Sequence, residues 1–119
     1  MATFTKNIRS IYAENGLAAS AAATSTGLNL STALQLDIQA RIKNGTAPTV
    51  GAKAIVEVSG DDSAYYEWGR AQAGIAASTI YDFTFPDIRG PKYARVVFDG
   101  AAGQTVSVTA IGHEITSIA

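Results

Sequence analysis

The stretch "LQLDIQARIKNG", residues 34–45, decides the fold class of this chain. Its apolar and polar side chains alternate strictly over ten positions, which is typical of a β-strand with one face in the core and the other in water. The pair Asn44-Gly45 then predicts a turn. The apolar set is Leu34, Leu36, Ile38, Ala40 and Ile42, and the polar set is Gln35, Asp37, Gln39, Arg41 and Lys43.

Further strands are predicted on the C-terminal side of this stretch. "VGAKAIVEVSGD" (50–61) puts four small or branched apolar residues on one face, and "STIYDFTFPD" (78–87) alternates Tyr81, Phe83 and Phe85 before Pro86, which cannot donate to a strand ladder. "KYARVVFDG" (92–100) and "GQTVSVTAIGHEITSI" (103–118) have the pattern of two closing strands. No segment shows a sustained helical stripe. The sequence therefore predicts an all-β chain, an antiparallel β-sandwich of jelly-roll-like type.

The N-terminal residues differ in composition from the rest. "GLAASAAATSTGLNLST" (16–32) is uncharged and rich in alanine, serine and threonine, with no apolar face to pack. We interpret residues 1–27 as an extended N-terminal arm that leads to an edge segment, and residues 28–119 as the β-sandwich domain. An arm of small residues suits lying across another protein's surface. The alternative is a partly disordered terminus.

Composition excludes several classes of partner. Of 119 residues, 47% are hydrophobic and only 16% charged, and the net charge is −1. A chain so nearly neutral lacks the positive field that attracts phosphate backbones, so we expect no nucleic-acid partner. No run is long and apolar enough for a membrane span, so we expect no membrane partner. The low charge suggests instead that neighbouring proteins cover part of the surface. The chain has no cysteine, which excludes disulfides and thiolate metal sites.

No catalytic constellation is visible in the sequence. The single histidine, His113, is followed by Glu114, and alternation along a strand places these two side chains on opposite faces. There is no G-x-S-x-G turn and no glycine-rich phosphate motif. We therefore predict that the chain is not an enzyme and needs no cofactor.

The segment "GDDSAYYEWGR", residues 60–70, concentrates the polar and aromatic chemistry of the chain. Asp61, Asp62 and Glu67 could supply oxygen ligands, but the spacing of a calcium loop is missing. We expect a solvated turn in which the acids cap backbone amides, and no metal site.

The aromatic residues of this segment, Tyr65, Tyr66 and Trp68, are the candidate binding residues. On a strand, Tyr65 and Glu67 would face one way and Tyr66 and Trp68 the other. These aromatics could be core residues, anchors of a protein interface, or a platform on which sugar rings stack. We predict that one of them packs in the core and that another is left for a partner.

The order of these elements resembles that of small virion proteins of tailed bacteriophages. The resemblance covers about residues 26–115 and rests on "LNLST", the alternating strand that ends "IKNGTAP", the turn "VEVSGD", and "YARVVF" with its Gly/Ala-rich turn. It implies a non-enzymatic β-sandwich or jelly-roll protein that decorates or cements a capsid. It carries no signature residues.

The implied partners are the major capsid protein or another virion protein, with the chain itself forming a dimer or trimer. The implied location is the virion, assembled in the bacterial host cytoplasm. Two alternatives stay open: a carbohydrate-binding module on a phage tail or fibre, and a neck or tail completion protein.

Overall fold

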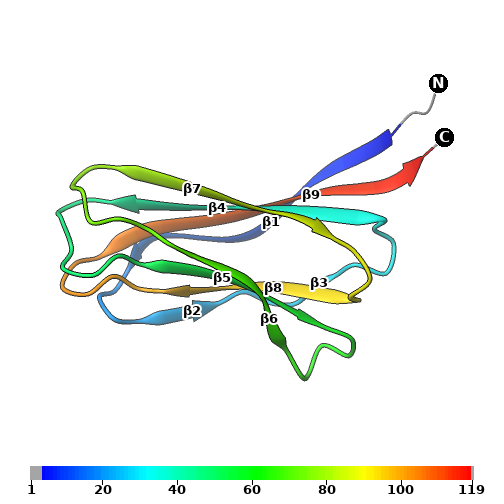
Figure 1. Cartoon of the computed structure of the whole chain (residues 1–119), viewed down its shortest axis with the longest axis horizontal. Helices are drawn as coiled ribbons and strands as arrows, with labels where there is room; N and C mark the ends of the chain where they lie inside the picture. Colours follow the sequence, from blue (N-terminus) through cyan, green and yellow to red (C-terminus); the bar gives the residue numbers. More distant parts are fainter. Residues whose placement is uncertain (1–3, 119) are drawn as a thin grey trace.

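The computed structural model describes residues 4–118, which form two packed β-sheets (Figure 1). One sheet, sheet A, has the strand order β1-β9-β4-β7, and the other, sheet B, has the order β2-β8-β5-β6 with β3 also paired to β8. All pairings are antiparallel. The strands are β1 (Phe4–Leu17), β2 (Ala22–Thr24), β3 (Leu28–Asn29), β4 (Gln35–Asn44), β5 (Lys53–Ser59), β6 (Tyr66–Gln72), β7 (Ile80–Ile88), β8 (Tyr93–Asp99) and β9 (Val106–Ile118).

Strands β2 and β3 behave as one interrupted strand. Both pair with β8, and Ser25 bridges the gap between them, because its amide donates to the Val96 carbonyl and its hydroxyl accepts from the Val96 amide, each at 2.9 Å. Counted in this way, the two sheets have four strands each, in the order of an eight-stranded jelly roll. The predicted fold class is confirmed. Among the described residues, no helix has the length and hydropathy to cross a membrane.

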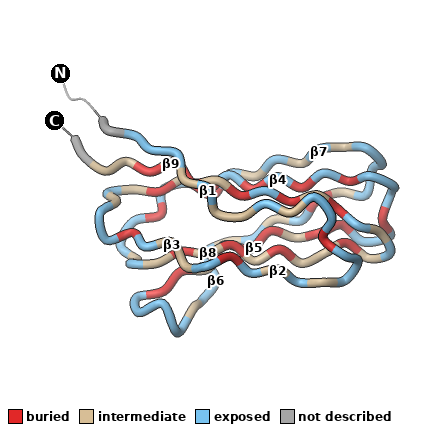
Figure 2. Tube along the Cα trace, turned by 180° about the vertical axis from the view of Figure 1, so that it is seen from behind, coloured by how far each residue is buried: buried red, intermediate tan, exposed pale blue. Residues whose placement is uncertain are grey.

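The core lies between the sheets, and the alternation that was read from the sequence builds it. In β4, every second residue from Leu36 to Asn44 is buried, and the residues between them are more exposed (Figure 2). Strand β8 alternates in the same way and contributes Phe98, the largest fully buried side chain. The inward-facing set predicted for β5, namely Ala52, Ala54, Val56 and Val58, is entirely inaccessible to solvent.

The expectation of an extended N-terminal arm is wrong for most of that stretch. Residues 4–17 form an edge strand that pairs with β9 along its whole length, and Leu17 belongs to the core. Three register shifts interrupt β1, one of them between Ser10 and Tyr12, so its apolar residues do not alternate. Because each bulge interrupts the alternation of inward and outward side chains, the sequence of β1 does not show the period of two that predicts a strand. Residues 1–3 of the expected arm lie outside the described residues.

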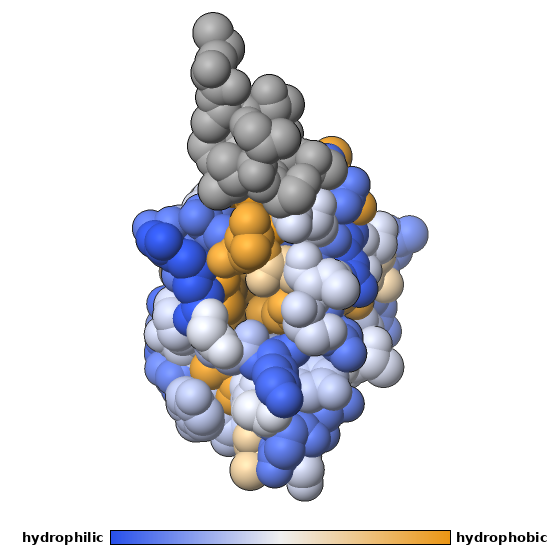
Figure 3. Space-filling view, turned by 90° about the vertical axis from the view of Figure 1, so that its right-hand side faces the viewer, coloured by the Kyte–Doolittle hydropathy of each residue, from blue (hydrophilic) through white to orange (hydrophobic). Residues whose placement is uncertain are grey.

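The two ends of the sandwich differ in what they carry. The β4–β5, β6–β7 and β8–β9 connections lie at one end, and the β3–β4, β5–β6 and β7–β8 connections lie at the other, together with both chain ends (Figure 1). The segment 60–70 therefore begins at the end where the termini lie. Hydrophobic side chains also gather in a hollowed surface at this end (Figure 3).

Candidate functional site

Tyr66 and Trp68 lie on the surface, on the edge strand β6 of sheet B. Tyr66 is 63% exposed and Trp68 is 42% exposed. Neither these two nor Tyr65 belongs to the core, so the prediction that one of the three aromatics packs inside is wrong.

A bulge explains the exposure of Trp68. Glu67 pairs with Glu57 and Gly69 with Val56, so Trp68 is an extra residue on β6 with no partner on β5. The core-facing position passes to Gly69, where an added Cβ would come within 3.3 Å of the Phe85 ring of sheet A. Phe85 thus occupies the space that the sequence reading assigned to an aromatic of this segment. The glycine after Trp68 was the available signal, since a glycine within a strand often marks a bulge.

Tyr65 is fixed on the outer side of sheet B by neighbouring charged groups. The guanidinium carbon of Arg95 lies 3.8 Å from the centroid of the Tyr65 ring, a cation–π contact. The Tyr65 hydroxyl donates to the Asp62 carboxylate, and Arg95 also donates to Glu57 at 2.8 Å. Partial burial, followed by the hydrogen bond to Asp62, raises the pKa of Tyr65 to about 12. Tyr65 therefore helps to hold the β5–β6 loop against β8.

The acidic loop before β6 is built as a capped turn. One oxygen of Asp61 accepts hydrogen bonds from the amides of Ser63 and Ala64, both at 3.0 Å, and from the Ser59 hydroxyl at 2.9 Å. These bonds, with the Ala64 amide first, hold the pKa of Asp61 below its usual value. The expectation that these acids cap backbone amides is confirmed for Asp61.

The three possible metal ligands of this segment have separate partners in the structure. Asp61 caps the turn, Asp62 binds Tyr65, and Glu67 accepts from the guanidinium of Arg70, with Nε at 3.0 Å. Within residues 4–118, no three or more histidine, aspartate or glutamate side chains come together as a metal site would require. The arrangement stiffens the loop that carries the aromatic residues.

His113 and Glu114 point to opposite sides of sheet A, as their sequence spacing predicts. His113 lies on the outer face, where its Nε2 is 3.1 Å from the side-chain oxygen of Gln39. Glu114 is buried and forms an ion pair with Arg9 at 3.3 Å. The imidazole and the carboxylate therefore do not form a base–orienter pair.

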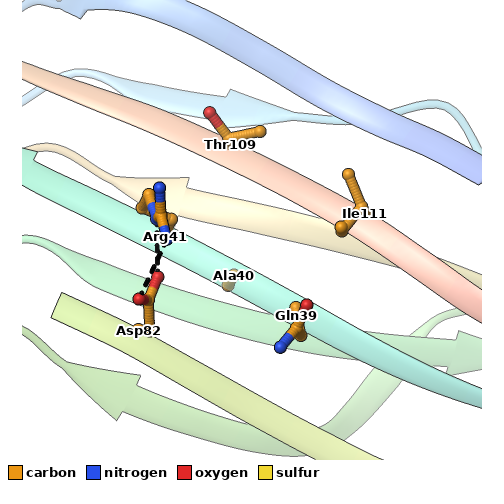
Figure 4. A pocket seen from close by; sticks show the side chains of 6 residues that line it. All are labelled: Gln39, Ala40, Arg41, Asp82, Thr109 and Ile111. Atoms are coloured by element: carbon orange, nitrogen blue, oxygen red, sulfur yellow. Dashed lines mark hydrogen bonds and ion pairs between the residues drawn. The ribbon is translucent and has the colours of Figure 1, made fainter. Parts of the chain in front are cut away.

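The outer face of sheet A is hollowed in two places, a feature that the sequence does not predict. One hollow of about 270 Å³ is lined by Gln39, Arg41, Asp82, Thr109 and Ile111 (Figure 4). There Arg41 binds Asp82 through two parallel hydrogen bonds of 2.7 and 3.1 Å, which lower the pKa of Asp82. A larger hollow of about 470 Å³ lies on the same sheet near the chain ends, lined by Lys6, Asn7, Ile8, Asp37, His113, Glu114 and Ile115.

The sequence held part of the signal for this face. Alternation over residues 35–43 predicts a solvent-facing row of polar side chains, but the sequence does not say which strands lie beside it. Only the pairing of β4 with β7 and β9 brings Arg41 next to Asp82 and Gln39 next to Ile111.

Comparison with known proteins finds likeness of fold. No family model matches the chain, and no curated protein matches its sequence. Among solved structures, the PBSX exported protein XepA superposes with a TM-score of 0.64 at 10% identity, over 93% of this chain and 37% of XepA, so the chain spans little more than a third of that protein. The PRD1 vertex protein P5 gives a TM-score of 0.58 at 11% identity, over 97% of this chain and 99% of P5.

A third similar structure is the SPBc2 prophage-derived protein YomS. Its TM-score is 0.53 at 10% identity, over 95% of each chain. At such identities, these likenesses establish a shared fold and nothing about activity.

Proposed function

We propose that this chain is a non-enzymatic structural protein of a bacteriophage virion that binds the capsid as a decoration or cement protein. The observation that carries the proposal is the match of nearly the whole chain to the SPBc2 prophage-derived protein YomS and to the PRD1 vertex protein P5. The phage-like order of elements in the sequence supports the same assignment. Location in the virion and binding to the major capsid protein are parts of this proposal.

The proposed mechanism is adhesion. Tyr66 and Trp68 are large aromatic side chains on a strand edge, next to a loop that Asp61 and Tyr65 hold in one conformation. Aromatic anchors on a rigid support lose little conformational entropy on binding, which is why such residues dominate many protein interfaces. A protein that binds the closed shell and not the opened one stabilises the closed shell by linkage.

The test compares virions assembled with and without this chain. We expect single-particle imaging to lose a defined density from the capsid surface when the chain is absent. We also expect the particles without it to release their DNA at a lower temperature. Particles of unchanged capsid density and unchanged thermal release would contradict the proposal. Density lost from the neck or tail would instead favour a completion protein.

The pair of exposed aromatics also favours a second candidate, a carbohydrate-binding module. Tyr66 and Trp68 lie within one strand of the ion pair between Glu67 and Arg70, so stacking surfaces and hydrogen-bonding groups are close together. Saturable binding of the wild-type protein to a glycan array, lost in Trp68→Ala, would support this candidate. Capsid attachment that survives the same substitution would favour it further.

A further inference from the structure

We propose that the outer face of sheet A binds a second copy of this chain, face to face, about a two-fold axis that passes over Gln39 and Ile111. This inference rests on the structure alone and stands apart from the proposed function. It assigns the partner surface of sheet A, whereas the aromatic residues of β6 lie on the other sheet.

The sheet edges are poorly suited to pairing with another chain, which directs association to a face. Strand β6 carries the bulge at Trp68, and β1 has three register shifts. Strand β7 contains Pro86 near its end, followed by Asp87, whose φ is +61°. The remaining edge is divided between β2 and β3. Bulges, prolines and short strands are the devices by which proteins prevent edge-to-edge association.

An uncharged row of side chains crosses the middle of the outer face of sheet A. Strand register places Ser10 beside Ile111, Ile111 beside Gln39, and Gln39 beside Thr84. Charged residues lie on both sides of this row along β4, with Asp37 two positions before Gln39 and Arg41 two positions after it. Figure 4 shows Gln39, Arg41 and Ile111 on this open surface.

Along β4, this arrangement of charges is complementary to itself under a two-fold rotation. A two-fold axis in the plane of the interface, perpendicular to β4 and over Gln39, lays β4 of one copy antiparallel over β4 of the other. It brings Asp37 of each copy opposite Arg41 of its partner. The two symmetry-related contacts therefore each pair an acidic side chain with a basic one. Arg41 uses two of its five donors on Asp82, which leaves others for a second carboxylate.

The shape of the face fits the same axis. Ile8 is 71% exposed and pairs with His113 across the sheet. The two-fold places this pair over the pair of Ala13 and Thr109 on the partner copy. A projecting isoleucine thus meets an alanine on the partner. Packed sheets rotate by about 30° relative to each other, so the correspondence is closest near the axis.

The area of the face approaches what a standard interface buries on each partner. Four strands spaced about 4.8 Å apart, each about ten residues long at about 3.3 Å per residue, cover roughly 600 Å² in projection. The relief given by projecting side chains and by the two hollows raises the accessible area above that figure. A standard interface buries about 800 Å² on each partner.

The experiment uses two opposite charges at the axis. Gln39 is exposed, so Gln39→Asp and Gln39→Lys should fold. In each variant alone, a two-fold places like charges against each other, and light scattering after size exclusion should show at least tenfold weaker dimerisation than for the wild type. Mixing the two variants in equal amounts should restore a particle of twice the 12.3 kDa chain mass, because the introduced carboxylate of one copy then meets the introduced ammonium group of the other.

The matched control is the same pair of substitutions on the other sheet. Gln72 is also an exposed strand glutamine, but it lies on β6 of sheet B, so Gln72→Asp and Gln72→Lys should leave the dimer unchanged. A wild-type chain that stays monomeric up to high micromolar concentration, or forms a trimer, would overturn the proposal. So would Gln39 variants that dimerise as well as the wild type, or dimerisation lost only in the Gln72 variants. Capsid attachment is measured separately, so failure here leaves the proposed function standing.

Discussion

At the scale of single residues, side chains with similar sequence signals take very different places in this molecule. Trp68 is exposed because Gly69 takes the core-facing position after the bulge. Asn44, expected in a turn, is the last residue of β4 and fully buried, and its amide nitrogen donates to the carbonyls of Gly74 and Ala76, both at 3.0 Å. One asparagine therefore fixes the β6–β7 connection.

Replacing Asn44 by alanine should destabilise the protein by about 1–3 kcal/mol, since two partly buried hydrogen bonds would be lost. Urea unfolding followed by circular dichroism would measure this loss. Asn15→Ala, a change at an exposed asparagine, is the control and should have little effect. Equal unfolding midpoints for the two variants would show that Asn44 does not clamp the loop.

Replacing the exposed aromatics should affect binding and not stability. We expect Trp68→Ala and Tyr66→Ala to weaken capsid attachment by about 1–4 kcal/mol, the range of interface anchors, with nearly unchanged melting temperature. Phe98→Ala, in the core, should instead lower the free energy of unfolding by about 3–5 kcal/mol. Attachment that is insensitive to both surface substitutions would remove β6 from the interface.

The environment of Tyr65 predicts its behaviour at alkaline pH. Its pKa is raised from 10.0 to about 12 in the folded protein. The folded state therefore holds this proton more tightly than the unfolded state, and the resulting stability is present in full below about pH 10 and is lost as the pH rises through about 12. When phenolate formation is followed by absorbance during an alkaline titration, Tyr65→Phe should lack one tyrosine ionisation that the wild type shows near pH 12. If the wild type and Tyr65→Phe differ only near pH 10, the contacts with Arg95 and Asp62 do not persist in solution.

At the scale of elements, β1 shows that an irregular strand can be essential to a sheet. It covers one side of β9, and the ring of Tyr12 lies 6.1 Å from that of the core residue Phe98, centroid to centroid. Its bulges bring both odd-numbered and even-numbered residues to the inner face of the sheet, so Leu17 and Tyr12 both contact the core.

Deleting residues 1–17 should prevent stable folding, because β9 would lose its partner and part of the core would be uncovered. Circular dichroism and the dispersion of amide resonances would report it. Ser10→Ala, an exposed change on the same strand, should fold normally. A truncated chain that folds cooperatively would restore the interpretation of this stretch as an arm.

At the scale of the whole molecule, the first and last described strands lie side by side. Phe4 pairs with Ile118, and the two chain ends leave the sandwich together (Figure 1). The pairing of β1 with β9 thus joins residues from 89 positions apart (Leu17 and Val106) to 114 positions apart (Phe4 and Ile118), and such non-local pairing slows folding.

A circular permutant should therefore fold faster than the natural chain. Joining residue 118 to residue 4 through a short linker turns β1 and β9 into a hairpin, and the exposed β7–β8 connection at Gly90 offers a place for the new ends. We expect a native circular dichroism spectrum and a several-fold higher refolding rate by stopped flow. An unchanged rate would mean that β1 docks after the rate-limiting step.

The sequence by itself determined the all-β class and the inward faces of β4 and β5, because a period of two is a local property that the pleated backbone converts directly into burial. It also separated His113 from Glu114 and predicted that acids such as Asp61 would cap backbone amides. Only the tertiary structure decided that β1 is a strand, that Trp68 is exposed, and which residues share the outer face of sheet A. A bulge changes which alternate residues of a strand face the core, and no unambiguous local sequence pattern marks it. The neighbours of a strand are set by contacts between segments far apart in the chain. Phe85 fills the core above Gly69 because packing between the sheets selected the side chain that fits, and no single strand contains that information.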